Sequence, residues 1–554
     1  MPFYESQPVI YPLHRLLLEV LSGEILVPRF QRPGTEDTWK PEQRGELLDS
    51  IYRGFPIGTI LLWSTNEKVN TLSVLGGAII PASSNENRRL RLVLDGHQRL
   101  STLVRILGPG IEEYNKNVED SSPQEVWVFE VVSEDIEDPS KGRFRLLKPG
   151  DKPEIKDVPL KIALDRVQLN EWVRARKDLT SSDIKLVDSL RDRFREYSIP
   201  VATLAAESLE VATETFKRIN SSGTPMSDFH MVAALAYTNN FEPQEHFDLV
   251  RTEHLEPVGW GDVDDADILR VCAGLVRRSG GPGELYQHPA KLNIDRLGKA
   301  LRDNPSLIEK AGISIAEVGE LLSNFAGVHG PGILPYSWQL IVMAIEFGSR
   351  PEIHLSEPEI KQACRWFWLT TYGGVFASTK TTVVDRAGRA LSDMLVGGNE
   401  NAMQRDIVRQ VEPPTRFDFR AARSRACLLA MARIADQGNL TGEAHHRLAD
   451  VGVSTVKTLW PKYGRSWYNL VIEPSDTQLR NIRDAFRRRS NAKSIADDDI
   501  LLEKVGIPAN ATGGIEELLQ IRSAYLTEKE RLFVVQLGLS FNSSSEQVQS
   551  VEIT

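Results

Sequence analysis

Five consecutive residues combine groups suited to a charged ligand: Asp95, Gly96, His97, Gln98 and Arg99. A carboxylate can bind a metal ion or orient water, whereas an amide and a guanidinium can donate hydrogen bonds to phosphate oxygens. This combination indicates a site for a nucleotide or a metal–phosphate. The alternative is a purely structural turn, in which Asp95 caps a helix and Arg99 forms a surface ion pair.

The neighbouring residues predict how this cluster is positioned. Leucine alternates with other residues over 89–94, which is the period of a half-buried strand, and apolar residues of 100–107 recur at helical spacing. Because Asp95-Gly96 interrupts both patterns, we expect a strand, a tight polar turn and a helix. Such a turn directs backbone N–H groups and the positive end of the helix dipole toward one point, where an anion is favoured.

A second polar segment could reach the same ligand. Arg29, Gln31 and Arg32 lie on a stiff, extended stretch that begins at Pro28 and ends at Pro33. The two arginines and the glutamine offer donors suited to phosphate oxygens. By itself the segment is a weak signal, because arginine in a loop is usually solvated.

A third segment, Asn220, Ser221, Ser222 and Gly223, predicts a loop of small residues between two helices. Its backbone and hydroxyl donors could approach a phosphate or a ribose closely. The same residue types are typical of a well-capped turn between helices. Alone, these residue types fit a ligand-binding loop and a structural turn equally well.

The composition predicts a multidomain globular protein. A chain of 554 residues is too long for one core, and 41% hydrophobic with 26% charged residues argues against wholesale disorder. The net charge of −10 excludes general binding of polyanions by the whole molecule. Any contact with nucleic acid must therefore come from local basic patches.

The cysteines and the apolar runs predict a cytoplasmic protein without a membrane partner. Cys272, Cys364 and Cys427 lie far apart without CxxC spacing, which fits a reducing compartment and argues against a disulfide framework. The N-terminal residues lack the basic and apolar regions of a signal peptide, and no apolar run approaches the roughly 18 residues that span a membrane.

The patterns along the chain predict an α+β fold. Residues 1–250 mix both periods and are expected to form a nucleotide-binding domain, whereas 251–405 are mainly helical. A smaller mixed α/β domain is expected at 406–540, with a flexible tail at 541–554. The sequence contains no Walker, Rossmann, HExxH or GxSxG motif.

Three segments, in this order, resemble the N-terminal domain of GmrSD-type restriction endonucleases, the "DGQQR" family with a ParB/sulfiredoxin-like core. They are VPRFQRP at 27–33, LVLDGHQRLSTL at 92–103 and FKRINSSGTPMS at 216–227. The resemblance covers roughly residues 10–240. It implies a mixed ParB/sulfiredoxin-like domain that binds and hydrolyses a nucleoside triphosphate with a divalent metal. It also implies defence against phage or modified foreign DNA.

The resemblance also implies roles for individual residues. Asp95 would position the metal or the attacking water, and Gln98 and Arg99 would contact the triphosphate. Magnesium is the implied metal, because triphosphates are usually bound with it. The cofactor-binding residues expected around them are Arg29, Gln31, Arg32, Gly96, Asn220, Ser221, Ser222 and Gly223.

The chain departs from the family pattern at His97, where the family has its first glutamine. Histidine can still donate or accept a hydrogen bond, so nucleotide binding could survive. Because histidine titrates near neutrality, hydrolysis could become dependent on pH. The replacement puts in doubt any role that needs an amide at this position.

Many relatives carry a C-terminal HNH nuclease, and residues 457–481 resemble its frame. Trp460-Pro461 and Asn469 match in order, but Lys457-Thr458 stands where the general-base histidine belongs. Without a base and a metal ligand, the attack of water on a phosphodiester fails. We therefore expect a degenerate HNH-like domain retained for binding. A shifted alignment that uses His446 is the alternative.

A basic stretch follows this frame. Arg480, Arg483, Arg487 and Arg488 would share one face of a helix and could contact a DNA backbone through charge alone. The alternative is a solvated helix whose charge is offset by the three aspartates at 497–499.

Together these features favour a nucleoside-triphosphate-binding and hydrolysing component of a bacterial restriction or anti-phage system. Its C-terminal domain would contact DNA or a partner nuclease subunit. One alternative is a nucleotide-gated, ParB-like DNA-binding module with little turnover. Another is an HNH-type endonuclease regulated by the nucleotide. The sequence leaves the oligomeric state open.

Overall fold

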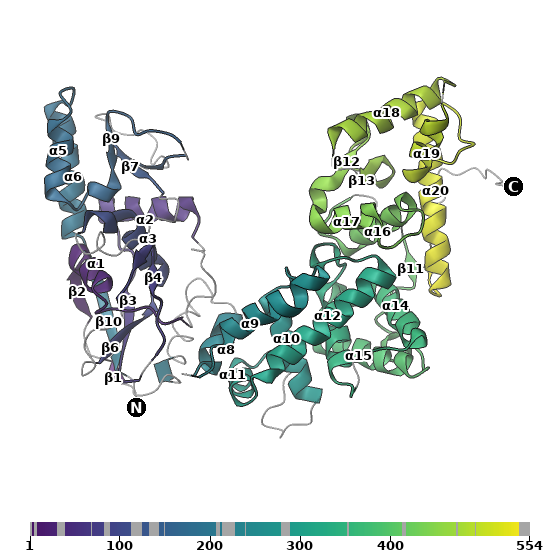
Figure 1. Cartoon of the computed structure of the whole chain (residues 1–554), viewed down its shortest axis with the longest axis horizontal. Helices are drawn as coiled ribbons and strands as arrows, with labels where there is room; N and C mark the ends of the chain where they lie inside the picture. Colours follow the sequence, from purple (N-terminus) through teal and green to yellow (C-terminus); the bar gives the residue numbers. More distant parts are fainter. Residues whose placement is uncertain are drawn as a thin grey trace. The chain divides into compact units, whose positions relative to one another are not determined.

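The chain forms two compact units, Met1–Glu242 and Pro243–Thr554 (Figure 1). The computed structural model describes residues 3–4, 8–29, 39–67, 69–81, 89–111, 125–131, 143–148, 150–205, 211–212, 228–238, 240–278, 288–351, 354–412, 417–472, 475–493 and 495–541. The first unit mixes helices and strands and the second is mainly helical, which confirms the α+β class. The ParB/sulfiredoxin-like core stays a prediction. The second unit contains both segments, 251–405 and 406–540, that the sequence predicts as separate domains.

A five-stranded sheet forms the centre of the first unit. Its strands are β1 (Phe3–Tyr4), β2 (Val9–Pro12), β3 (Ile60–Thr65), β6 (Leu90–Asp95) and β10 (Ser198–Ala205). The order is β1-β10-β3-β6, and β2 also pairs with β10. Strand β10 runs parallel to β3, whereas β6 runs antiparallel to β3 with Asp95 opposite Leu61. The end of β6 therefore lies beside the beginning of β3.

Strand β6 is covered on both faces. Leu92, Val93 and Leu94 are fully buried, and consecutive residues of a strand point to opposite faces. The same hydrophobic core draws residues from α1 (Leu13–Leu21), α2 (Pro41–Arg53), α3 (His97–Leu107) and α6 (Ser181–Glu196). Packing on both sides fixes the direction in which β6 presents its last residue, Asp95.

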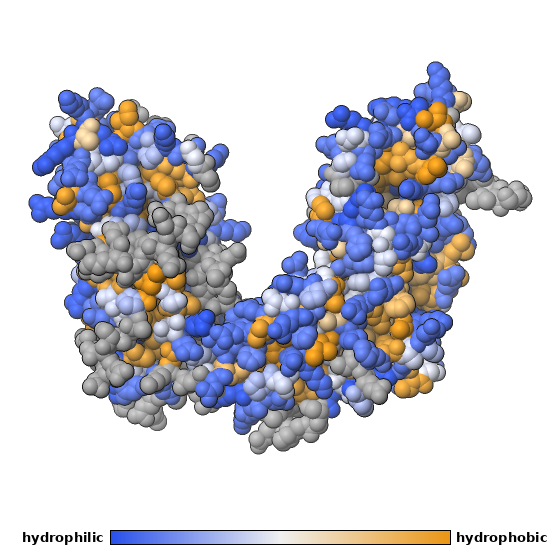
Figure 2. All heavy atoms as spheres, viewed as in Figure 1, coloured by the Kyte–Doolittle hydropathy of each residue, from blue (hydrophilic) through white to orange (hydrophobic). Residues whose placement is uncertain are grey.

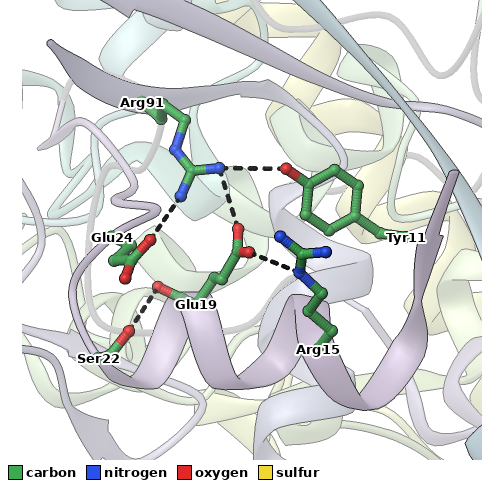
Figure 3. Close-up of polar contacts among 6 residues, drawn as sticks. All are labelled: Tyr11, Arg15, Glu19, Ser22, Glu24 and Arg91. Carbon is green, nitrogen blue, oxygen red and sulfur yellow. Dashed lines mark hydrogen bonds and ion pairs between the residues drawn. The ribbon is translucent and has the colours of Figure 1, made fainter. Parts of the chain in front are cut away.

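Arg91 joins β6 to helix α1 through a cluster of polar contacts (Figure 3). Its guanidinium donates to Glu19 at 2.9 Å, to Glu24 at 3.0 Å and to the Tyr11 hydroxyl at 3.3 Å. Arg15 donates to the other oxygen of Glu19 at 3.0 Å. The cluster ties β6 to α1 and includes no residue of the candidate site.

Strand β3 begins later than its sequence pattern suggests. The apolar run predicts a strand from Ile57 to Trp63, but β3 spans Ile60–Thr65. Gly58 adopts a φ of 86°, which is incompatible with an extended strand. Residues 55–59 instead form a loop, called loop 55–59 below, that contributes to the candidate site.

The remaining elements of the first unit surround this sheet. A three-stranded sheet has the order β8-β7-β9. These strands, the β4–β5 hairpin and two further helices have the bounds β7 (Trp127–Glu130), β8 (Phe144–Leu146), β9 (Asp157–Pro159), β4 (Val74–Leu75), β5 (Ala78–Ile79), α5 (Arg166–Arg174) and α8 (Asp228–Ala236).

Helices dominate the second unit. They are α9 (Pro243–Val250), α10 (Asp265–Arg278), α11 (Ile294–Asp303), α12 (Ser306–Ala326), α13 (Ser337–Gly348), α14 (Glu357–Tyr372), α15 (Thr381–Leu395), α16 (Ala422–Ala435), α17 (Glu443–Asp450), α18 (Asp476–Ser490), α19 (Ala496–Lys504) and α20 (Ile515–Gln536). Two short strand pairs accompany them: β11 (Gln410–Val411) with β14 (Ser540–Phe541), and β12 (Val456–Thr458) with β13 (Leu470–Ile472). Among the described residues, no helix is long and apolar enough to cross a membrane.

Candidate functional site

The segment singled out in the sequence folds as a strand, a glycine and a helix. Strand β6 ends at Asp95, Gly96 has a φ of 97°, and α3 begins at His97. This confirms the predicted strand–turn–helix. Residues 95–99 are called the Asp95 corner below. Because the first backbone N–H groups of a helix lack partners within it, the corner presents donors at the end of the sheet.

Only glycine fits at the second position of the corner. A Cβ atom on Gly96 would lie 2.3 Å from Ile60 Cδ1 and 3.1 Å from Arg99 Nη2. The positive φ adds backbone strain for any other residue. Ile60 of β3 and Arg99 therefore leave no room for a side chain at Gly96.

Arg99 binds the protein itself. Its Nη1 donates to the carbonyl of Ile57 at 2.7 Å, and its Nη2 donates to the carbonyl of Thr59 at 3.1 Å and to Asp95 Oδ2 at 2.8 Å. The Arg99 side chain is only 14% exposed, whereas that of Asp95 is 33% exposed. Arg99 therefore positions Asp95 and loop 55–59, and Asp95 is the more accessible of the two charged groups.

Loop 55–59 is fixed from its other side by Tyr197. The Tyr197 hydroxyl donates to the carbonyl of Phe55 at 2.7 Å and accepts the backbone N–H of Ile57 at 3.1 Å. Burial raises the pKa of this hydroxyl, so it keeps its proton at neutral pH. A Cβ on Gly58 would lie 2.6 Å from Arg99 Nη1, so glycine is needed here too.

His97 and Gln98 contact each other in the first turn of α3. Gln98 Nε2 lies 3.1 Å from His97 Nε2, so the amide donates when that ring nitrogen carries no proton. Gln98 Oε1 is buried and has no hydrogen-bond partner. An unsatisfied buried carbonyl is costly, and a ligand that brings an N–H or O–H donor would relieve that cost.

The segment that carries Arg29 approaches the same end of the sheet. Leu26 forms a parallel bridge with Leu92. The segment that leads to Arg29 therefore runs in the same direction as β6, which leads to Asp95. Arg29 Nη1 donates to Glu242 at 3.1 Å. The two other predicted residues of this segment, Gln31 and Arg32, lie outside the described residues.

The predicted small-residue loop, Asn220 to Gly223 with Ser221 and Ser222, also lies outside the described residues. The chain resumes at α8, and Tyr237 at the end of that helix accepts the backbone N–H of Asn70 at 2.8 Å. Asn70 in turn accepts the N–H of Arg29 at 2.9 Å. The region that follows the predicted loop therefore contacts the segment beside the corner.

The C-terminal frame folds as two antiparallel strands followed by helix α18. Lys457 pairs with Val471, and the carboxamide of Asn469 accepts the N–H of Trp460 at 3.0 Å and donates to its carbonyl at 2.8 Å. Asn469 thus closes the loop between the strands. Lys457 and Thr458 lie on β12, at the position where the resemblance would require the general base.

The two histidines upstream of this frame have partners elsewhere. His446 lies on α17, and its ring centroid is 4.2 Å from that of His329. His445 Nδ1 lies 2.7 Å from Asp436. Among the described residues, no three His, Cys, Asp or Glu side chains form a group that could hold a metal ion.

The arginines of α18 divide into two groups. Arg483 donates to the carbonyls of Leu459 and Thr458, and Arg488 forms a two-point pair with Asp498 at 2.5 and 2.9 Å. Arg480 and Arg487 are exposed. Arg487 donates to Asp484 at 2.7 Å, and its guanidinium lies 5.3 Å from the ring centroid of Trp460.

Two contributors to the corner were not anticipated from the sequence. Loop 55–59 offers backbone carbonyls to Arg99, and Tyr197 holds this loop from a position about 140 residues further along the chain. Every residue has a backbone carbonyl, so residue types do not show which carbonyls accept hydrogen bonds from a side chain. Gly58 is the one signal, because a glycine that interrupts an apolar strand indicates close approach of another group.

One family model matches the chain. Residues 13–237 match the model described as the GmrSD restriction endonuclease, N-terminal domain. The matched range lies within the first unit and contains the Asp95 corner, loop 55–59 and Tyr197. No curated protein matches the chain.

Proposed function

We propose, from the match of residues 13–237 to the GmrSD N-terminal domain, that the chain binds and hydrolyses a nucleoside triphosphate as a component of a DNA restriction system. The Asp95 corner is the proposed site. Asp95, His97 and Gln98 would contact the nucleotide and its metal, whereas Arg99 would position Asp95 and loop 55–59. The residues of 29–32 and 220–223 would complete the pocket.

The observation that carries this proposal is the corner itself. An accessible carboxylate lies at the start of a helix, whose free N–H groups favour an anion. Beside them lies the unsatisfied Oε1 of Gln98, an acceptor for a donor on the ligand. Charge, backbone donors and an unused acceptor together fit a phosphorylated ligand better than a simple capped turn.

The residues present also fit magnesium. Mg²⁺ in nucleotide sites is usually bound by one or two carboxylates, substrate phosphates and water. Asp95 supplies one carboxylate at the corner and would hold the ion. When bound, the ion would offset the negative charge of the phosphates.

Replacement of Asp95 by asparagine tests the proposal. We expect phosphate release from nucleoside triphosphate to fall by roughly a hundredfold or more, because the carboxylate that orients metal or water is lost. The measurement is release of inorganic phosphate by the full chain with magnesium, with each of the four common triphosphates. Addition of EDTA should abolish release by the wild type.

Asp49→Asn is the matched control. Asp49 forms the same i,i+4 ion pair, with Arg53 at 2.9 Å, but lies on α2 outside the corner. Phosphate release should therefore stay at the wild-type level in this variant. Equal release by wild type and Asp95→Asn would contradict the assignment of Asp95.

A second candidate function is a nucleotide-gated DNA-binding module that turns over little nucleotide. It is favoured by the ion pair between Asp95 and Arg99, which competes with a metal for the carboxylate. In the same assay, tight binding of nucleotide without phosphate release by the wild type would support this candidate and exclude the first. Absence of nucleotide binding would exclude both.

Within this proposal, the exposed arginines of α18 contact DNA. Arg480 and Arg487 are exposed, and the pair of Arg487 with Asp484 lies at the surface, whereas Arg483 and Arg488 are bound to half-buried or buried groups of the chain. The double variant Arg480→Ala/Arg487→Ala should weaken binding to duplex DNA and reduce the slope of log affinity against log salt by about 2. Arg420→Ala, which removes an exposed arginine paired with Asp418, is the control. An unchanged slope would contradict the contact.

Strand cleavage is proposed to come from a partner nuclease subunit. Lys457 and Thr458 occupy the strand where the HNH-like frame requires a histidine, and neither can act as a neutral general base at physiological pH. The remaining candidate, His446, lies outside this frame on α17, with its ring against that of His329 at an interplanar angle of 35°. The C-terminal unit would then serve as a binding module for DNA and for that partner.

A further inference from the structure

The second unit contains a cavity of about 800 Å³ that the proposed function does not use. Its walls come from the end of α12 and from α14, α16, α17, α19 and α20. Aromatic side chains line much of it: Trp368, Trp467, Tyr525 and Phe533. In the space-filling view, hydrophobic residues gather beside α20, whereas the outer side of α18 is hydrophilic (Figure 2).

A buried histidine with a fixed orientation forms part of the cavity wall. His445 is 1% exposed, and its Nδ1 lies 2.7 Å from Asp436 Oδ2. Asp436 also accepts the backbone N–H groups of Ala444 and His445 at 3.0 and 3.1 Å. An ionised carboxylate only accepts hydrogen bonds, so Nδ1 carries the proton and Nε2 is left as an acceptor.

This acceptor is unsatisfied. Nε2 of His445 is buried without a hydrogen-bond partner. Burial lowers the pKa of His445, which keeps the ring neutral and Nε2 unprotonated. Gly327 packs against this edge of the ring, where a Cβ would lie 2.7 Å from Nε2. The site therefore keeps a bare ring nitrogen in an apolar wall, which is costly unless a ligand supplies a donor.

Two cations mark the rim of the same cavity. Arg433 and Lys529 line it with exposed side chains. Arg433 lies over the ring of Phe533, and Lys529 lies over the ring of Tyr525, at 5.8 and 5.3 Å from the ring centroids. Positive charge next to aromatic walls suits a flat ring that carries an anionic substituent.

We propose that this cavity binds a nucleotide. The base would pack among the aromatic walls and donate an N–H to His445 Nε2, and the phosphate would face Arg433 and Lys529. The cavity volume lies within the usual range for small-ligand sites. The same chemistry is shared by a free mononucleotide and by an unpaired nucleotide of single-stranded DNA, and the test distinguishes these two sources.

The test is calorimetric titration of the full chain. One arm uses AMP, GMP, CMP and UMP as free mononucleotides, and the other uses a short single-stranded oligonucleotide of mixed sequence. We expect the wild type to bind a probe of at least one arm at millimolar concentration or below. The probe that binds with the higher affinity per nucleotide shows whether the ligand is a free mononucleotide or a nucleotide of single-stranded DNA.

Variants locate the site. His445→Phe keeps a ring but removes the acceptor, and it should lower affinity roughly tenfold. Lys529→Ala should lower affinity several-fold. Because Lys529 is exposed, this substitution should leave the packing of the buried cavity wall intact. Arg531→Ala is the control, because Arg531 lies on the same helix, is paired with Glu528 and does not line the cavity.

Ligand binding in this cavity can be distinguished from nucleotide binding at the Asp95 corner. Asp95→Asn should leave this binding unchanged even where it abolishes phosphate release. Failure of the wild type to bind any of the probes would overturn the proposal. Binding that survives unchanged in both His445→Phe and Lys529→Ala would overturn it as well.

Discussion

Gly96→Ala is expected to unfold at a lower urea concentration than the wild type and to lose nucleotide binding. The φ of 97° costs an L-residue about 1–2 kcal/mol. The added Cβ would lie 2.3 Å from Ile60 Cδ1 and would crowd Arg99, and such overpacking costs about 1–3 kcal/mol. The two effects together give a loss of about 2–5 kcal/mol in the free energy of unfolding.

Gly54→Ala separates backbone strain from the collision. Gly54 ends α2 with a φ of 77°, yet a Cβ there would meet no atom within 4 Å. This variant should therefore lose only the strain, about 1–2 kcal/mol, and should bind nucleotide normally. Urea unfolding of both variants, followed by circular dichroism, provides the comparison. Equal losses in the two variants would show that the contact with Ile60 and Arg99 does not matter.

Glu530→Ala is expected to destabilise the second unit by about 3–5 kcal/mol, because it leaves the largely buried guanidinium of Arg423 without its carboxylate partner. Arg423 donates to both oxygens of Glu530, at 2.6 and 2.7 Å, and the Tyr372 hydroxyl adds a contact at 3.1 Å. Glu530 is 2% exposed. These contacts connect α14, α16 and α20, which also form walls of the aromatic cavity. Their loss should therefore disturb the packing of these walls.

The control is an exposed pair on the same helix. Glu528 and Arg531 lie 2.7 Å apart with more than a third of each side chain exposed, and such pairs contribute about 0–1 kcal/mol. Thermal unfolding of Glu528→Ala should therefore resemble that of the wild type. If Glu530→Ala unfolds at the same temperature as Glu528→Ala, the buried pair is not important for stability.

The corner could be predicted from the sequence because its signals are local. Alternating leucines over 89–94 and the helical spacing of 100–107 fix a strand and a helix, and only a few residues lie between them. The role of Arg99 could not be predicted in the same way. A guanidinium in the first turn of a helix can bind a phosphate or a backbone carbonyl, and only the fold brings Ile57 and Thr59 into reach.

The basic helix shows the same limit in the second unit. The sequence predicts one charged face over 480–488, with the aspartates at 497–499 as its alternative partners. In the structure Arg488 pairs with Asp498, whereas Arg487 is exposed beside Trp460. Residue spacing identifies a charged face, but it cannot assign each charge to solvent, to a neighbour or to a ligand, because that choice depends on the packing of α19 against α18.

Strand β10 is the last strand of its sheet to be synthesised, yet it lies in the interior of that sheet, between β1 and β3. Tyr197, which immediately precedes it, fixes loop 55–59, and this loop accepts the hydrogen bonds of Arg99. A nascent chain that has emerged only as far as α3 thus contains the corner and loop 55–59 but not Tyr197, which holds this loop in place. Pairing over such long separations is slow compared with local folding. Competence for ligand binding would therefore appear in one late step, when β10 enters the sheet, and not gradually during synthesis.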